Sequence, residues 1–165
     1  MERRKTNPAE VALAILAQLR AQLIDANEAN CFLALEPNPT VPNVGGWFCV
    51  VEFAGGQFDE GVLDGAGREA VRQTNTITIT TYSLAALDQA GQHGTFLTND
   101  TAGVFRKWRE VLDALTLFDP VAEDGKGLLC EPMFPTDYGP VIARKPTRAG
   151  WTQNFRITFE WDLTV

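Results

Sequence analysis

Gln153-Asn-Phe-Arg-Ile-Thr-Phe-Glu-Trp-Asp-Leu-Thr-Val165 is a stretch of sequence in which apolar and polar side chains alternate. Its apolar members are Phe155, Ile157, Phe159, Trp161 and Leu163. The residues between them are Arg156, Thr158, Glu160, Asp162 and Thr164. Because successive side chains of a β-strand point to opposite faces of a sheet, the pattern predicts one long strand with one strongly apolar face. A strand about twice the usual five or six residues requires a large sheet.

The composition is that of one globular domain of ordinary size. The chain has 165 residues, of which 45% are hydrophobic and 21% are charged, so it can build a real core. Its formal net charge of -7 argues against a nucleic-acid-binding surface, because affinity for a phosphate backbone comes from clustered Lys and Arg. We therefore expect protein partners before nucleic acid.

The three cysteines, Cys31, Cys49 and Cys130, are widely spaced and stand among apolar neighbours. An odd number in this setting is typical of reduced core thiols in a cytosolic protein, not of a disulfide framework.

The N-terminal region shares one feature with a secretory signal, because basic residues at 3–5 precede an apolar run at 11–17. Gln18 and Arg20 break that run, and no clear small-residue cleavage site follows it. No run approaches the roughly 18 apolar residues that a membrane span needs. We expect a soluble protein that is not exported and does not enter a membrane.

Two amphipathic helices are predicted to pack on the sheet. The first begins at Asn7, a capping residue followed by Pro8 and Glu10, and continues to about residue 25. Its apolar stripe is formed by Ala12, Ile15, Leu16, Leu19 and Leu23. The second spans about 101–118, with Val104, Phe105, Trp108, Val111, Leu112 and Leu115 at core spacing. Its i, i+4 pairs, Arg106 with Glu110 and Arg109 with Asp113, are interpreted as a solvated face.

Proline and glycine divide the remaining chain. Strands are predicted at 47–53 and, in shorter form, at 128–134. The acidic, glycine-rich stretch 54–67 and the stretch 137–150, which holds Pro140 and Pro146, are predicted to be long loops. The sequence therefore predicts a single α+β domain over residues 1–165, with a mixed or antiparallel sheet, a long C-terminal strand and two packed helices.

A second long strand is predicted at 74–83, and the sequence has no charge from Gln73 through Leu87. One face of this strand would carry Thr76, Thr78 and Thr80. An uncharged, β-prone strand is an aggregation hazard at an open sheet edge, so something should cover it. An interior position in its own sheet and a subunit interface explain the pattern equally well.

No group of residues in the sequence predicts catalysis, a cofactor or a metal. His93 lies in a turn-like run without a nucleophile motif, and a single histidine without a Cys-x-x-Cys pair cannot supply a usual zinc site. The Gly65-Ala66-Gly67 triplet lacks the context of a phosphate loop. The carboxylate pairs Asp59-Glu60 and Glu123-Asp124 are interpreted as solvated loop residues.

The order of these parts resembles that of the tail terminator, or tail completion, proteins of tailed bacteriophages and related tail-like particles. The shared features are a leading helix, the strand at 47–53, the acidic loop, the Thr-rich strand, the helix at 101–118 and the alternating strand from Asn154 to Thr164. The resemblance implies a structural subunit, not an enzyme, that forms a ring, expected to be a hexamer. Such a ring caps the tail tube, halts its polymerisation and offers a docking surface to the neck of the head.

The partners implied by the resemblance are further copies of the chain, a tail tube protein and a neck or head-completion protein. The subunit would belong to the virion and would be assembled in the host cytoplasm. Ring closure would hide an uncharged strand edge, and an acidic chain would leave a pore that DNA crosses without specific binding. The candidate subunit interface consists of Thr76, Thr78, Thr80, Asp59 and Glu60.

Two alternatives stay open at the level of sequence. A tail tube or other neck or connector subunit would polymerise or join differently. A small α+β ligand-binding or enzymatic domain would be a monomer with a deep pocket near His93 or Trp151.

Overall fold

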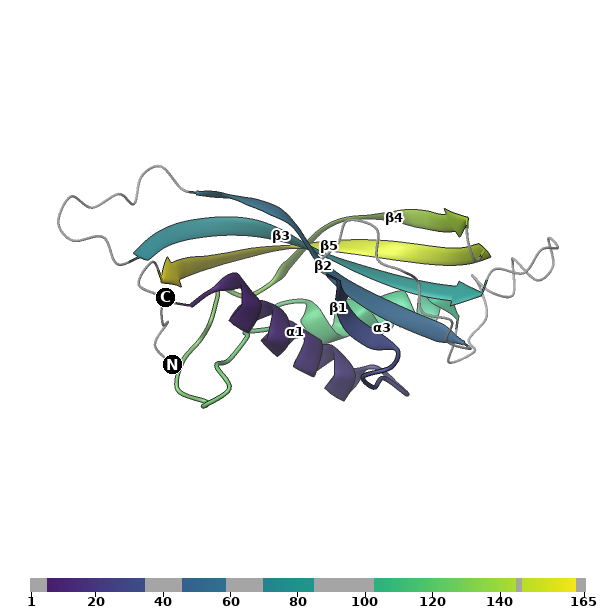
Figure 1. Cartoon of the computed structure of the whole chain (residues 1–165), viewed down its shortest axis with the longest axis horizontal. Helices are drawn as coiled ribbons and strands as arrows, with labels where there is room; N and C mark the ends of the chain where they lie inside the picture. The colour runs from purple at the N-terminus through teal and green to yellow at the C-terminus, as the bar shows by residue number, and fades with distance from the viewer. Residues whose placement is uncertain (1–5, 35–45, 59–69, 85–102, 145–146, 163–165) are drawn as a thin grey trace.

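The computed structural model places two helices on one face of a five-stranded sheet (Figure 1). It describes residues 6–34, 46–58, 70–84, 103–144 and 147–162, and the counts refer to these residues. The elements are α1 (Pro8–Gln22), β1 (Cys31–Ala34), β2 (Trp47–Phe58), β3 (Ala70–Leu84), α3 (Val104–Leu115), β4 (Phe134–Arg144) and β5 (Thr147–Asp162). The strand order is β1-β2-β3-β5-β4, in which β1 and β2 are parallel and the other pairs antiparallel. The predicted α+β class is confirmed.

The alternating C-terminal stretch forms the second half of β5. Phe155, Ile157 and Phe159 are buried, whereas Arg156 and Glu160 are exposed, so the predicted apolar face is confirmed from 155 to 159. Thr158 of the predicted polar face is also buried, and Leu163 and Thr164 lie outside the described residues. The strand begins at Thr147, six residues earlier than the predicted Gln153, and it pairs with β3 along its whole length. Burial of the apolar face of this long interior strand makes the sheet one wall of the core.

The core lies between the sheet and the two helices. Strand residues such as Ile77, Ile79 and Phe155 meet the α1 stripe, whose buried members are Val11, Ala12, Ile15, Leu16 and Leu19. The predicted start of α1 is confirmed, because the Asn7 side chain accepts a hydrogen bond of 3.0 Å from the Glu10 backbone N–H. The three cysteines are free and buried, as the sequence predicts.

The predicted loop at 137–150 is wrong, because residues 137–144 belong to β4 and residues 147–150 to β5, which pairs with it. β4 lies at the edge of the sheet, where a proline such as Pro140 can sit without leaving a ladder hydrogen bond unmade. Gly150 serves a close approach, because a Cβ atom there would lie 2.7 Å from Cδ1 of Tyr82 on the paired strand. Proline and glycine in this segment therefore mark an edge and a tight contact, not a loop.

Other boundaries also differ from prediction: α1 and α3 each end about three residues early, and β3 begins at Ala70 instead of residue 74. Residues 54–58 of the predicted loop continue β2 as far as Phe58, with a bulge between Phe53 and Gly55, and residues 59–67 lie outside the described part. The predicted strand at 128–134 is also wrong, because Leu128 makes only an isolated bridge with Val121. The assignment of the whole chain to one domain stays a prediction.

Candidate assembly surface

The uncharged strand β3 lies in the interior of the sheet. It pairs with β2 on one side and with β5 on the other, so both of its edges are hydrogen-bonded within the chain. Of the two explanations for its lack of charge, the interior position is the correct one. Both edges of β3 are already covered within the chain, so ring closure is not needed to hide them.

The candidate interface threonines lie on the sheet face opposite the helices. Thr76 and Thr78 are half-buried there, alternating with the core residues Ile77 and Ile79, whereas Thr80 is only 2% exposed. The other two candidates, at 59 and 60, fall outside the described residues. The structure brings the threonines together in one row, and their role in a subunit interface stays a prediction.

This helix-free face is crossed by a ladder of polar contacts between β3 and β5. Thr74 Oγ1 lies 3.2 Å from Thr158 Oγ1, and the Thr78 hydroxyl donates to Asn154 Oδ1 at 2.7 Å. The Asn154 amide in turn donates to Asp137 Oδ2 at 2.8 Å. Hydroxyl and amide groups paired in this way stabilise a sheet face and do not form an acid and base pair.

The carboxylate of Asp137 ends this ladder at the edge strand β4. A hydrogen bond from Thr136 Oγ1, and after it the one from Asn154, holds the pKa of Asp137 below its ordinary value. The group is exposed and ionised at neutral pH, so it adds a fixed negative charge to this edge.

Four aromatic side chains join α3 to the β4–β5 hairpin. Trp151 packs against Phe105 and Tyr138, with ring centroids 4.9 and 6.0 Å away, and Trp108 lies 5.3 Å from Tyr138. Trp108 Nε1 donates a 3.0 Å hydrogen bond to the buried side chain of Gln153. The surroundings of Trp151, where the enzymatic alternative expects a pocket, are thus packed with aromatic rings.

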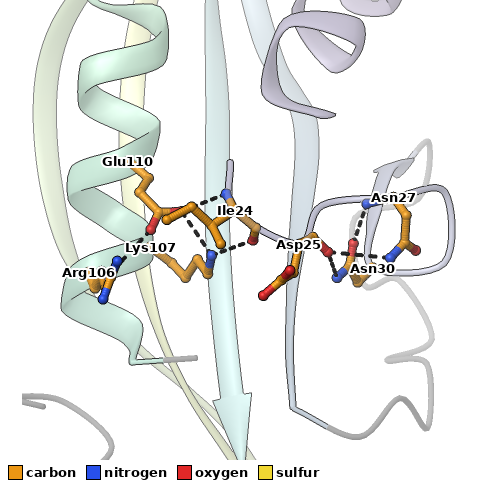
Figure 2. Close-up of polar contacts among 7 residues, drawn as sticks. All are labelled: Ile24, Asp25, Asn27, Asn30, Arg106, Lys107 and Glu110. Atoms are coloured by element: carbon orange, nitrogen blue, oxygen red, sulfur yellow. Dashed lines mark hydrogen bonds and ion pairs between the residues drawn. The ribbon is translucent and has the colours of Figure 1, made fainter. Parts of the chain in front are cut away.

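Lys107, a buried residue that the sequence analysis does not predict as such, links α3 to the chain just after α1 (Figure 2). Lys107 is 0% exposed, and its Nζ donates to the Ile24 carbonyl at 2.7 Å and to Glu110 Oε2 at 2.8 Å. The same ammonium lies 4.1 Å from the ring centroid of Trp47. Glu110 also accepts from the Ile24 N–H and from Arg106. The charges of this cluster are paired, and their arrangement is structural.

The position of Lys107 in the sequence already indicates that it faces the core. It stands three residues after Val104 and four before Val111, on the same helix face as these buried side chains. Glu110 is its i+3 neighbour, so the sequence also supplies the counter-charge. The prediction that Glu110 belongs to a fully solvated face is wrong, because its side chain is only 15% exposed.

The turn after α1 is closed by local hydrogen bonds, also drawn in Figure 2. Asp25 takes a left-handed backbone conformation, with φ of 62°, and its carbonyl accepts from the side-chain amides of Asn27 and Asn30. Asparagine side chains that bond to nearby backbone groups stabilise such turns. The turn leads directly into β1. It also holds the Ile24 carbonyl in the position where it accepts from Lys107.

Cys31 on β1 and Cys49 on β2 are register partners, and both are 0% exposed. A hydrogen bond between the thiols lowers the pKa of Cys31 and, together with burial, raises that of Cys49 well above its ordinary value. A nucleophilic cysteine is typically accessible to its substrate, whereas these two are enclosed in the core.

An apolar groove of about 930 Å³ lies between α1, from Glu10 to Arg20, and the segment from 118 to 129. Leu13 and Val121 face it while remaining 59% and 37% exposed. Its charged lining residues are Glu10, Arg20, Glu123 and Asp124. An exposed apolar surface rimmed by charges is typical of a site that contacts another molecule.

Within the described residues, no three His, Cys, Asp or Glu side chains stand close enough to hold a metal ion. In that same part of the chain no helix is long and apolar enough to cross a membrane. His93 and the 65–67 glycines fall in segments that the structure does not describe.

Two solved structures are similar to this chain over almost its whole length. One is a chain of the virion of a native gene transfer agent particle, with 17% identity and a TM-score of 0.55 over 92% of this chain and 96% of that one. The other is the sheath/tube terminator of an extracellular contractile injection system, with 11% identity and a TM-score of 0.54. The fold of this chain is similar to that of a sheath/tube terminator. The resemblance drawn from the sequence is therefore confirmed at the level of the fold.

The alignment with the sheath/tube terminator covers 97% of this chain and 58% of that protein, so this chain spans little more than half of its neighbour's length. No family model and no curated protein matches the sequence. Identities this low carry the arrangement of helices and strands and do not transfer individual residues.

Proposed function

We propose that this chain is a tail terminator, a structural virion protein that forms a ring on the end of a tail tube and joins the tail to the head or neck. The observation that carries the proposal is the terminator fold shared over 97% of this chain. The ring is proposed to be a hexamer, with a tail tube protein on one side and a neck or head-completion protein on the other. Assembly would take place in the host cytoplasm.

The described polar groups support a structural role. The threonine and asparagine side chains of the helix-free face bond to one another, and Lys107 and Glu110 are paired inside the protein. None of these contacts leaves an acid, a base and a nucleophile converging on one reacting position, as a hydrolytic or transfer enzyme requires. We therefore propose that the chain has no enzymatic activity. The net charge of -7 is consistent with a pore that DNA crosses without specific contacts.

A tail tube or connector subunit is the second candidate. It is favoured by the gene transfer agent neighbour, which is described only as part of a whole virion and so fits several positions in a tail. The two candidates differ in how assembly ends: a tube subunit continues to add, whereas a terminator stops at one ring.

Sedimentation velocity of the purified protein over a wide concentration range distinguishes these candidates. We expect one discrete oligomer, six times the 18.1 kDa of the chain, whose mass stays constant once it has formed. A polymer that lengthens with concentration would contradict the terminator proposal and favour a tube subunit. A monomer at every concentration would favour the ligand-binding or enzymatic alternative.

A further inference from the structure

Helix α1 is apolar on the side that faces away from the sheet as well as on the side that packs against it. Between Glu10 and Arg20 it has no charged residue. Leu13 is 59% exposed, Ala17 is also exposed, and Ala14 is half-buried. In Figure 1, α1 lies below the sheet with its outer side turned away from the strands. A helix that is apolar all round is normally buried on every side, so we expect another molecule to cover this face.

The second helix shows how a solvated outer face is built in this protein. α3 packs on the same face of the sheet as α1, and its exposed side carries the charged residues Arg109 and Asp113. The lack of charge on the outer side of α1 therefore does not come from its position in the fold. It distinguishes α1 from α3 and indicates a contact surface.

The groove beside α1 is built within one subunit. Its second wall is the turn of residues 118–129, in which the Ala122 N–H donates to the Gly127 carbonyl at 3.0 Å. The groove follows α1 for about three turns, or roughly 15 Å at the rise of a helix. A groove of this length accommodates about three turns of a second helix laid beside α1.

The rim of this groove is acidic. The charged side chains that line it are three carboxylates and one guanidinium: Glu10, Glu123, Asp124 and Arg20. The guanidinium is already engaged, because Nε and Nη2 of Arg20 donate to the Cys31 carbonyl at 3.0 and 2.8 Å. Asp119 and Lys126, the other charged residues of the 118–129 turn, cancel each other. The groove therefore attracts a partner that carries Lys or Arg beside its apolar side chains.

We propose that this groove binds an amphipathic α-helix of another protein, with its apolar side chains on Leu13, Ala17 and Val121 and its Lys or Arg side chains at the acidic rim. A helix satisfies its own backbone hydrogen bonds, so it can lie on apolar walls without leaving unpaired groups there. Nucleic acid and anionic lipid are repelled by the rim, and the grooves of two copies of this chain repel each other. The contact does not depend on the proposed ring, because the groove is complete in one subunit.

Fluorescence anisotropy with two labelled synthetic helices tests this contact. Each peptide has about 15 residues, long enough for an isolated helix, with leucines along one face. The first has lysines on the opposite face, and the second has glutamates at the same positions. We expect the lysine helix to bind and the glutamate helix to bind about tenfold more weakly or less, because the rim is acidic. No binding of the lysine helix, or equal affinities for the two helices, would overturn the proposal.

Leu13→Asp separates this contact from a general attraction between a cationic peptide and an acidic protein. The change adds a negative charge, which would strengthen a purely electrostatic contact, but it places a carboxylate on the apolar wall. We therefore expect the affinity for the lysine helix to fall about tenfold or more. Leu117→Asp is the matched control, because Leu117 is also 59% exposed but does not line the groove. Equal affinities of the two variants for the lysine helix would count against the groove as its site and overturn the proposal.

Glu123→Lys tests the acidic rim in the same assay. We expect this change to weaken binding of the lysine helix about tenfold, whereas Asp113→Lys, the same charge change on the exposed side of α3, should leave it unchanged. Equal losses would show that net charge alone sets the affinity and would overturn the proposal. Sedimentation velocity of Leu13→Asp completes the test: loss of wild-type self-association in this variant would assign the groove to a second copy instead. A wild-type protein that forms no ring but binds the lysine helix as expected would contradict the proposed function and leave this contact standing.

Discussion

Replacing Lys107 with methionine is expected to lower the free energy of unfolding by about 3–5 kcal/mol, the range for removal of one partner from a buried ion pair. Methionine keeps much of the volume of the methylene chain but cannot donate to the Ile24 carbonyl or to Glu110, which now receive bonds of 2.7 and 2.8 Å. The Glu110 carboxylate would still accept hydrogen bonds from Arg106 and from the Ile24 N–H, but it would lose its buried counter-charge. The junction between α1 and α3 would loosen first.

Urea denaturation of the variant measures this loss. Arg109→Ala is the matched control, because Arg109 is an exposed cation two residues along the same helix and its loss should change stability by less than about 0.5 kcal/mol. Equal stabilities for the two variants would show that the Lys107 cluster does not hold the helices together.

Replacing Phe155 with alanine is expected to cost about 3–5 kcal/mol, the range for a fully buried phenylalanine. Phe155 is 0% exposed and belongs to the core cluster that includes Ile77, its register partner on β3. Domains of this kind have total stabilities of about 5–15 kcal/mol, so the change would remove a large share and could prevent folding at 37 °C.

Arg156→Ala, at the next residue of the same strand, gives the control for Phe155→Ala. Its side chain is exposed and lies over the Phe134 ring at 5.8 Å, so its loss should cost less than about 1 kcal/mol. Thermal unfolding of both variants measures the difference. Similar losses at the two positions would contradict the assignment of one buried and one exposed face to β5.

The elements read most reliably from the sequence are those whose pattern is set by one local rule. The alternation along β5 and the spacing of the α1 stripe each reflect burial of a single face, and the Asn7 cap is a local hydrogen bond. These features need no knowledge of distant residues, so the sequence predicts them correctly.

The features that the sequence does not predict depend on long-range arrangement. Whether Pro140 breaks a strand or lies on one depends on β4 being at the sheet edge, and whether β3 is interior depends on its pairing with both β2 and β5. The burial of Lys107 depends on the Ile24 carbonyl from another segment. The groove combines α1 with a segment more than a hundred residues later, which no local pattern reveals.

The most direct test of the terminator function is negative-stain electron microscopy of preformed tail tubes incubated with this protein and then supplied with fresh tube subunits. We expect tubes that carry one extra ring at a single end and do not elongate from that end. Tubes that keep growing at both ends, or fibres built from this protein itself, would contradict it.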